Sequence, residues 1–280
     1  MEKALLIKLL LTFWEFCDKI RKVIYLIGGK YKMKKIMSFV FAAMMVLSLA
    51  ACGGEKADYV IATDKGFSPF EFQDEAGNIV GIDMDILAAI AEDQGFTYDL
   101  QYIGWDAAIA ACQAGQADGM IAGASITDER KASGWTFSDG YYDATQGMAV
   151  AADSTIAGFE DMQGKKVAVK NGTMSNEYAE SIKEEYGFEV VTFPTSPDMY
   201  QAVMGGQVDA CMDDTPILKY NIKTGELKMK YVDGTENDPA QYGFAIFDSN
   251  KQELVDLFNA GLKNIRENGK YDEIIAKYLG

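Results

Sequence analysis

Histidine is absent from this chain of 280 residues, and only four cysteines and five prolines occur in it. Without histidine the sequence lacks the commonest zinc ligand, the usual partner of a nucleophilic Ser or Cys, and the base that titrates most readily near neutral pH. The cysteines are Cys17, Cys52, Cys112 and Cys211, and they make none of the close CxxC spacings of metal and redox sites. We therefore expect no metal, no cofactor and no catalytic residues.

Basic residues are scarce in most of the chain. Residues 1–51 hold nine of the 26 Lys and Arg and three of the 42 Asp and Glu, so residues 52–280 hold 17 basic and 39 acidic residues, a formal charge of −22. Binding to phosphates needs a basic face, so we expect no nucleic-acid partner. The hydrophobic content of 49% is that of a globular chain with one large or two modest cores.

A secretory signal is present near the N-terminus. The basic segment Met33–Lys35 precedes about fifteen mostly apolar residues that end in small ones, which predicts a signal peptide at residues 33–51. The run is too short for a comfortable membrane span. Its ending, Leu49–Cys52, resembles the bacterial lipobox, which implies cleavage before Cys52 and lipid attachment to its thiol. The alternative is a plain signal peptide with an incidental Cys, and residues 52–57 form a polar tether in either case.

Residues 1–32 fit a signal peptide badly, because a second apolar stretch, ALLIKLLLTFWEF, precedes the basic segment. We interpret them as an over-extended gene start, in which Gly28–Lys30 is translated from a ribosome-binding sequence upstream of a true start at Met33. The alternative is a real second anchor.

Short β-type runs alternate with helical patterns twice along the rest of the chain. In the first block the strands are 59–63, 98–103 and 118–123, and the helices are Asp85–Gln94 and Asp106–Gln113. In the second block the strands are 165–170, 188–193 and 208–214, and the helices are Ser175–Tyr186 and Asp198–Met204. This alternation predicts α/β architecture with a largely parallel sheet, and blocks of about ninety residues favour two similar lobes. Cys112 and Cys211 are expected to be buried small hydrophobes, one in each lobe.

Two helices, 252–268 and 271–279, end the chain without enough strands to stand alone. If they dock on the first lobe, the chain crosses between the lobes twice, and two crossings beside a cleft predict a hinge that closes on a ligand. The expected boundaries are 58–140 plus 243–280 for the first lobe, 146–237 for the second lobe, and 141–145 plus 238–242 for the hinge.

The stretch ASITDERKA, residues 124–132, has the pattern of a loop that enters a helix at Asp128. Thr127 is a suitable N-cap, and Asp128 and Glu129 suit the positive end of the helix dipole. Arg130 opposes that dipole, which raises the question of which negative charge accompanies it. Read alone, Arg130 is a solvated surface residue.

Six stretches carry a resemblance that answers this question. They are ATDKGFSPFEFQDEAGNIVGIDMDILAAIA, AGASITDERKASGWTFSDGYY, GKKVAVKNGT, DDTPILKY, YGFAIF and LKNIRENGKYDEIIAKY, and they span nearly all of residues 58–280. In this order they resemble the amino-acid-binding receptors of bacterial ABC importers, most closely the glutamine-binding ones. The resemblance implies a type II periplasmic-binding-protein fold, or Venus flytrap, which binds without catalysis outside the cytoplasmic membrane and delivers its ligand to an ABC permease.

The resemblance also implies the roles of several residues. The α-carboxylate of a free amino acid would meet Arg130, together with the backbone of Gly123 and the hydroxyl of Ser125. Asp214 would bind the α-ammonium, although it also suits the N-cap of the next helix. Its neighbour Asp213 is expected to face water.

Two aromatic residues, Phe67 and Trp105, match positions that sandwich the aliphatic part of the ligand. As bare sequence, each is a core aromatic. Met174 departs from the glutamine receptors, which have a glycine at this position, and its bulk would narrow the carboxylate end of the site.

Asp64 and Lys170 match the positions that face the ligand side chain. Asp64 can accept from an amide N–H and Lys170 can donate to an amide carbonyl, whereas a glutamate or arginine side chain would set like charges together. Glutamine is therefore favoured, and asparagine or another polar amino acid is the alternative that the sequence leaves open. Two rival functions remain, a dehydratase-like enzyme of the same fold and a stand-alone amino-acid sensor.

Overall fold

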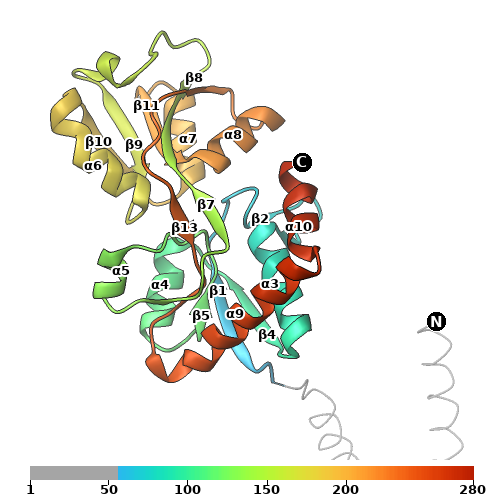
Figure 1. Cartoon of the computed structure of the whole chain (residues 1–280). Coiled ribbons are helices and arrows are strands. Elements are labelled where there is room, and N and C mark those ends of the chain that lie inside the picture. The colour runs from blue at the N-terminus through green and yellow to red at the C-terminus, as the bar shows by residue number, and fades with distance from the viewer. Residues whose placement is uncertain (1–55) are drawn as a thin grey trace, which may run out of the picture. The chain divides into compact units, whose positions relative to one another are not determined.

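Two five-stranded β-sheets build residues 56–280, the part of the chain that this computed structural model describes (Figure 1). We call the part built on the first sheet lobe 1 and the part built on the second sheet lobe 2. Residues 1–55 lie outside the described part of the chain. They include the upstream segment 1–32, the predicted signal peptide 33–51, Cys52 and most of the predicted tether 52–57. None of the described helices is both long and apolar enough to cross a membrane.

The first sheet has the strand order β4-β1-β5-β14-β6. Its strands are β1 (Tyr59–Thr63), β4 (Tyr98–Tyr102), β5 (Gly119–Met120), β6 (Thr136–Phe137) and β14 (Ala245–Ile246). Strand β1 is parallel to β4 and β5, whereas β14 is antiparallel to β5 and β6. A hairpin of β2 (Phe72–Gln73) and β3 (Ile79–Val80) leads from β1 toward the first helix of the lobe.

Lobe 1 contains five α-helices and one 3₁₀ helix. They are α3 (Ile82–Gln94), α4 (Trp105–Gln113), α5 (Asp128–Ala132), η2 (Ser249–Lys251), α9 (Gln252–Glu267) and α10 (Lys270–Leu279). The four longer helices are confirmed to within three residues of the predicted ends. The largest difference is at α3, where Gly81 is the N-cap with a φ of 140° and a Cβ atom would lie 1.9 Å from the Phe70 carbonyl oxygen. Only glycine fits this tight entry into the helix.

The second sheet has the order β10-β9-β11-β8-β12. Its strands are β8 (Gln146–Ala151), β9 (Lys166–Lys170), β10 (Glu189–Phe193), β11 (Ala210–Asp214) and β12 (Met229–Val232). Strand β9 is parallel to β10 and β11, whereas β8 is antiparallel to β11 and β12. The helices of this lobe are η1 (Phe159–Met162), α6 (Met174–Tyr186), α7 (Ser196–Met204) and α8 (Thr215–Thr224).

A two-stranded ribbon joins the lobes. Strand β7 (Tyr142–Ala144) is antiparallel to β13 (Ala240–Tyr242), and both run between the sheets in Figure 1. Each ribbon strand leads into the fourth strand of a sheet, since β8 follows β7 and β14 follows β13. Strands β8 and β14 are antiparallel to both of their neighbours, so each sheet contains parallel and antiparallel pairs. The sequence predicted a largely parallel sheet. The α/β class with two lobes and two crossings is confirmed.

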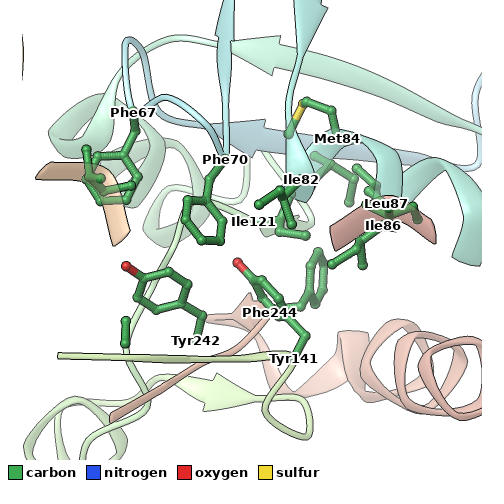
Figure 2. Packing of buried hydrophobic residues seen from close by; sticks show 14 of the residues in the cluster. Phe67, Phe70, Ile82, Met84, Ile86, Leu87, Ile121, Tyr141, Tyr242 and Phe244 are labelled. Atoms are coloured by element: carbon green, nitrogen blue, oxygen red, sulfur yellow. The ribbon is translucent and has the colours of Figure 1, made fainter. Parts of the chain in front are cut away.

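The C-terminal helices pack on lobe 1. Helix α9 lies against α3 and β14, and its buried face includes Leu254, Phe258, Leu262 and Ile265. The Phe258 ring stacks on Phe244 with ring centroids 4.9 Å apart and lies 6.2 Å from the Tyr141 ring. Figure 2 shows Phe244 and Tyr141 in the same apolar cluster as Ile86 and Leu87 of α3. The last helices therefore complete the core of the first lobe.

The two described cysteines are free and buried in different lobes, Cys112 in α4 and Cys211 in β11. Burial raises the pKa of the Cys112 thiol to about 12. Both behave as the small hydrophobes that the sequence predicts.

Truncation of Phe258 tests the docking of the C-terminal helices. Phe258 is 1% exposed, so Phe258→Ala should lower the free energy of unfolding by about 3–5 kcal/mol through lost burial and a residual cavity. Lys263→Ala, on the exposed side of the same helix, should change it by less than about 0.5 kcal/mol. Urea denaturation measures both, and equal midpoints for the two variants would contradict the packing described here.

Candidate ligand-binding site

The structure brings all nine predicted binding residues around one cavity between the lobes. Asp64, Phe67, Trp105, Gly123, Ser125 and Arg130 line it from lobe 1, and Lys170, Met174 and Asp214 line it from lobe 2. Ala122, Thr173 and Asp213 complete the lining. The strands explain this convergence, because Asp64 follows β1, and Lys170 and Asp214 end β9 and β11. The carboxyl ends of parallel strands are where open α/β sheets form their clefts.

Arg130 is a buried cation rather than a solvated one. Thr127 caps α5 as predicted, accepting from the Arg130 amide at 3.1 Å. The side chain is 7% exposed, and its Nη1 donates to the Ser125 carbonyl at 2.9 Å. The guanidinium lies 5.3 Å from the Trp105 ring centroid and 5.2 Å from that of Trp135. These aromatic faces stabilise the charge and fix its direction.

Arg130 has no ion-pair partner among the residues that the structure describes. Burial lowers its pKa, and the more distant Glu177 and Asp214 only oppose this effect. Trp135, which follows α5, is a site residue that the sequence reasoning missed. Its place beside the guanidinium depends on how the chain leaves α5, which no local pattern reveals.

Lys170 and Asp64 form an ion pair across the two lobes. Each residue is 3% exposed, so the pair is shielded from water and from salt. The Lys170 ammonium also lies 5.6 Å from the ring centroids of both Phe67 and Trp105. The predicted side-chain end of the site is therefore a compact group of two charges and two rings.

Further hydrogen bonds link the lobes around the cavity, among them one from Arg130 Nη2 to the Gly172 carbonyl at 3.4 Å. Trp105 Nε1 donates to the Gly172 carbonyl at 3.2 Å, and the Asn221 amide donates to the Ser68 carbonyl at 2.9 Å. Together with the Lys170–Asp64 pair, these bonds hold the lobes in a closed arrangement.

Asp214 is the N-cap residue of α8 by position, but its side chain makes no capping hydrogen bond. Instead the carboxylate accepts from Gln146 Nε2 at 2.7 Å and from the Tyr242 hydroxyl. Asn237 in turn donates to the Gln146 side chain at 2.7 Å. Burial, and then the neighbouring Asp213, raise the pKa of Asp214 to about 6. The carboxylate is thus directed into the cavity and held there by neutral donors.

Asp213 was expected to face water, and that expectation is wrong. It is 2% exposed and accepts from Ser196 Oγ at 3.0 Å, the Tyr200 hydroxyl at 2.5 Å and the Asp214 amide at 2.9 Å. The reason is that α6 and α7 both pack against β11, so neither face of this strand meets solvent. The cavity therefore holds three carboxylates against two cations.

Gly123 and Met174 shape the other walls. Gly123 has a φ of 55°, and a Cβ atom there would lie 2.7 Å from the Phe67 ring, so glycine is required. Met174 is the first residue of α6, where Thr173 caps the helix and backbone N–H groups lack partners within the helix. No group of Cys, Asp and Glu residues within 56–280 is arranged to hold a metal ion.

Named relatives match most of the chain. The probable histidine-binding protein of Neisseria gonorrhoeae is 29% identical over 260 residues, which cover 88% of this chain and 96% of the relative. The ABC transporter glutamine-binding protein GlnH of Bacillus subtilis is 30% identical over 275 residues, covering 88% of this chain and 98% of the relative.

Solved structures share the fold. Substrate-binding domain 2 of Lactococcus lactis GlnP, in an open conformation, is 42% identical with a TM-score of 0.56, and the match covers 81% of this chain and 97% of that one. An ancestral arginine-binding protein bound to arginine is 33% identical with a TM-score of 0.73, covering 81% and 100%. The ancestral amino-acid-binding protein AncCDT-1, a precursor of cyclohexadienyl dehydratase, is 32% identical with a TM-score of 0.71, covering 79% and 95%.

The TM-score is higher for the arginine-bound structure than for the open one, although the open one has the higher sequence identity. A family model for bacterial extracellular solute-binding proteins, family 3, matches residues 59–280. With this match over most of its length, the chain belongs to family 3 of the bacterial extracellular solute-binding proteins.

Proposed function

We propose that this protein is the receptor of an amino-acid ABC importer and that it captures glutamine by closing its two lobes. The observation that carries the proposal is that Arg130 of lobe 1 and Asp214 of lobe 2 line the same cavity. A free amino acid carries the two charges that complement them, a carboxylate and an ammonium. Arg130 and Asp214 come from different lobes, so both face the ligand only when the lobes are closed.

The carboxylate end centres on Arg130. A buried guanidinium without a counter-ion is costly, and a ligand carboxylate would remove that cost through bidentate hydrogen bonds. Helix α5 has only five residues, so its dipole adds little, and the guanidinium supplies most of the attraction. This would be the negative charge that makes Arg130 favourable in the first turn of a helix.

The side-chain end consists of Asp64 and Lys170. These two side chains form an ion pair across the cleft. The amide of glutamine can donate to Asp64 and accept from Lys170, so it replaces part of the ion pair without adding charge. A glutamate side chain would instead repel Asp64, and an arginine side chain would repel Lys170.

Asp213 favours a second candidate ligand, a cationic amino acid. A cavity with three carboxylates and two cations has a deficit of positive charge, and the relatives include a probable histidine-binding and an arginine-binding protein. We prefer glutamine because Ser196, Tyr200 and the Asp214 amide already satisfy the Asp213 carboxylate. The ancestral arginine-binding protein has also been solved with glutamine, so the fold accepts both ligands.

We also propose that the protein performs no chemistry. AncCDT-1 is described as a precursor of a dehydratase, so an enzyme of this fold is a real alternative. The chain has no histidine, and its cavity carboxylates are engaged by hydrogen bonds or the ion pair. Incubation with prephenate-like acids should give no product, and measurable turnover would refute this part of the proposal.

The place of action follows from the N-terminal segment. We propose that residues 33–51 direct export, that Cys52 carries the lipid anchor, and that the closed lobes are recognised by the membrane subunits of the permease. Loss of radiolabelled palmitate incorporation in Cys52→Ser would support the anchor.

Calorimetric titration of purified residues 53–280 with all twenty amino acids tests the proposed function. Glutamine should bind most tightly. Tight binding of arginine or histidine without a glutamine response would instead support the cationic alternative, and Asp213→Asn should then weaken that binding selectively. Failure of every amino acid to bind would refute the receptor function.

Removal of Arg130 should abolish binding of every amino acid. Arg130→Ala deletes two charge-assisted hydrogen bonds, so affinity should fall by at least about 100-fold whatever the ligand side chain. Lys170→Ala should mainly change the order of preference among glutamine, glutamate and arginine. Lys131→Ala, on the exposed side of the same short helix, is the matched control, and its affinity should stay within about twofold of the wild type. Equal losses in the Arg130 and Lys170 variants across all ligands would contradict this division of roles.

Acid should weaken binding through Asp214. Burial and the neighbouring Asp213 raise the pKa of Asp214 to about 6, and only the ionised form attracts the ligand ammonium. As the pH falls below that value, a proton must leave Asp214 before the ligand binds, so the association constant should drop by up to about tenfold per pH unit. Asp214→Asn should bind weakly with a flat profile, and the same acid loss in that variant would assign the effect to another group.

A further inference from the structure

Two buried acidic side chains lie behind the cavity and take no part in the proposed ligand contacts. Glu71, just before β2, and Asp83, in the first turn of α3, are both 0% exposed. No donor from the described residues reaches either carboxyl oxygen of Glu71 or Oδ1 of Asp83. The two residues are neighbours, since the Asp83 amide donates at 3.0 Å to the carbonyl of Phe70, next to Glu71, and each carboxyl group acts on the pKa of the other. Two adjacent buried carboxyl groups can hydrogen-bond to each other only if a proton lies between them.

The pair is tied to the walls of the cavity. Asp83 Oδ2 accepts from the Gly123 amide at 2.9 Å and from the Tyr141 hydroxyl at 2.9 Å. The backbone of Glu71 pairs with that of Phe67, the Phe67 amide donating to the Glu71 carbonyl at 2.9 Å. Gly123 and Phe67 line the cavity, and Tyr141 directly precedes the ribbon strand β7. Figure 2 shows the Tyr141 ring packed beneath Phe70 and Ile121, among the apolar side chains of lobe 1.

Within residues 56–280, no free cation compensates the pair. The charged groups that act on Glu71 besides Asp83 are Asp64 and Lys170, which already form an ion pair with each other. The other titratable groups nearby are the hydroxyls of Tyr102 and Tyr141. Burial raises the pKa of Glu71 well above its ordinary value and that of Asp83 to about 7. Burial also raises the pKa of Tyr141 well above its ordinary value, so its hydroxyl stays a donor.

We propose that Glu71 and Asp83 share one proton and act together as positioning residues for the ligand-binding loops. Protonated Glu71 donates to Asp83 Oδ1, and the Asp83 carboxylate holds the Gly123 amide and the Tyr141 hydroxyl. This inference rests on the proposed function in one respect, namely that Gly123 and Phe67 belong to an amino-acid site.

The arrangement makes binding sensitive to alkali. Loss of the shared proton leaves two adjacent carboxylates in a fully buried place, where their repulsion and desolvation are both unfavourable. Because the pKa of the pair is raised in the closed, folded form, the stabilisation is present at low pH and is lost as the pH rises through that pKa. The Gly123 loop and the start of the ribbon are then released from Asp83.

The decisive variant is Glu71→Gln, whose amide donates the same hydrogen bond without a titrating proton. We expect its Kd for L-glutamine at about pH 6 to lie within about twofold of the wild type. Between about pH 7 and pH 10 the wild-type affinity should fall more steeply, by up to about tenfold per pH unit above the pKa of the pair. The two proteins differ only at residue 71, so the ratio of the two Kd values isolates the pair. A ratio independent of pH would overturn the proposal.

Glu71→Leu separates positioning from simple filling of space. Leu lacks the hydrogen-bond donor, so Glu71→Leu should weaken glutamine binding by about tenfold at every pH. Glu71→Gln keeps a donor and should bind glutamine as the wild type does at about pH 6. If the Leu variant does not fold, the pH dependence of Kd in the wild type and in Glu71→Gln still tests the proposal. Equal affinities of the Leu and Gln variants would count against a hydrogen-bonding role.

Infrared spectroscopy of the ligand-free protein tests the shared proton without any ligand. At about pH 8, where solvent-exposed carboxyl groups are ionised, the wild type should show the carbonyl band of a protonated carboxylic acid, and Glu71→Gln should lack it. The exposed Glu253→Gln is the matched control and should keep the band. Absence of the band in the wild type overturns the inference even if glutamine binds. If the band is present but no amino acid binds in the titration, the proposed function is refuted and the shared proton is still established.

Discussion

The burial of charge between two lobes is the constraint on which the rest of this structure depends. Lys170 and Asp64 come from different sheets and satisfy each other only when the lobes are closed. Separating the lobes would return both ions to water, so the pair contributes little net free energy to closure. Under the proposed function the pair supplies selectivity, because a ligand that enters the cleft must offer groups that replace these contacts.

The sheet topology places those charges correctly. Strands β4, β1 and β5 of the first sheet are parallel, as are β10, β9 and β11 of the second. The carboxyl ends of these strands carry side chains to the cavity between the lobes. The fourth strand of each sheet continues directly from the connecting ribbon, which ties the position of the ribbon to both sheets. A small change in the ribbon therefore changes the distance between the two halves of the site, while each half keeps its own geometry.

Much of this architecture could be predicted from local patterns, and the exceptions have physical causes. The long helices follow from their apolar stripes, as in the buried face of α9. Strands β8 and β14 were not recognised because their pairing partners are distant in the sequence. The nine predicted binding residues came from motifs shared with a known family, and not from hydrophobic periodicity. The burial of Asp213 and the position of Trp135 beside Arg130 were not predicted, because both depend on tertiary packing, which a strand or loop pattern does not encode.

The position of β14 has a consequence for how the protein matures. Lobe 2 is formed by one continuous stretch, whereas the sheet of lobe 1 needs a strand that comes after it in the chain. During synthesis from the N-terminus, lobe 2 can reach its final form while lobe 1 still lacks an inner strand and its covering helices. The cleft between the lobes cannot form until β14 and the helices that follow it have emerged, so a chain that ends before β14 lacks this cleft however well lobe 2 has folded.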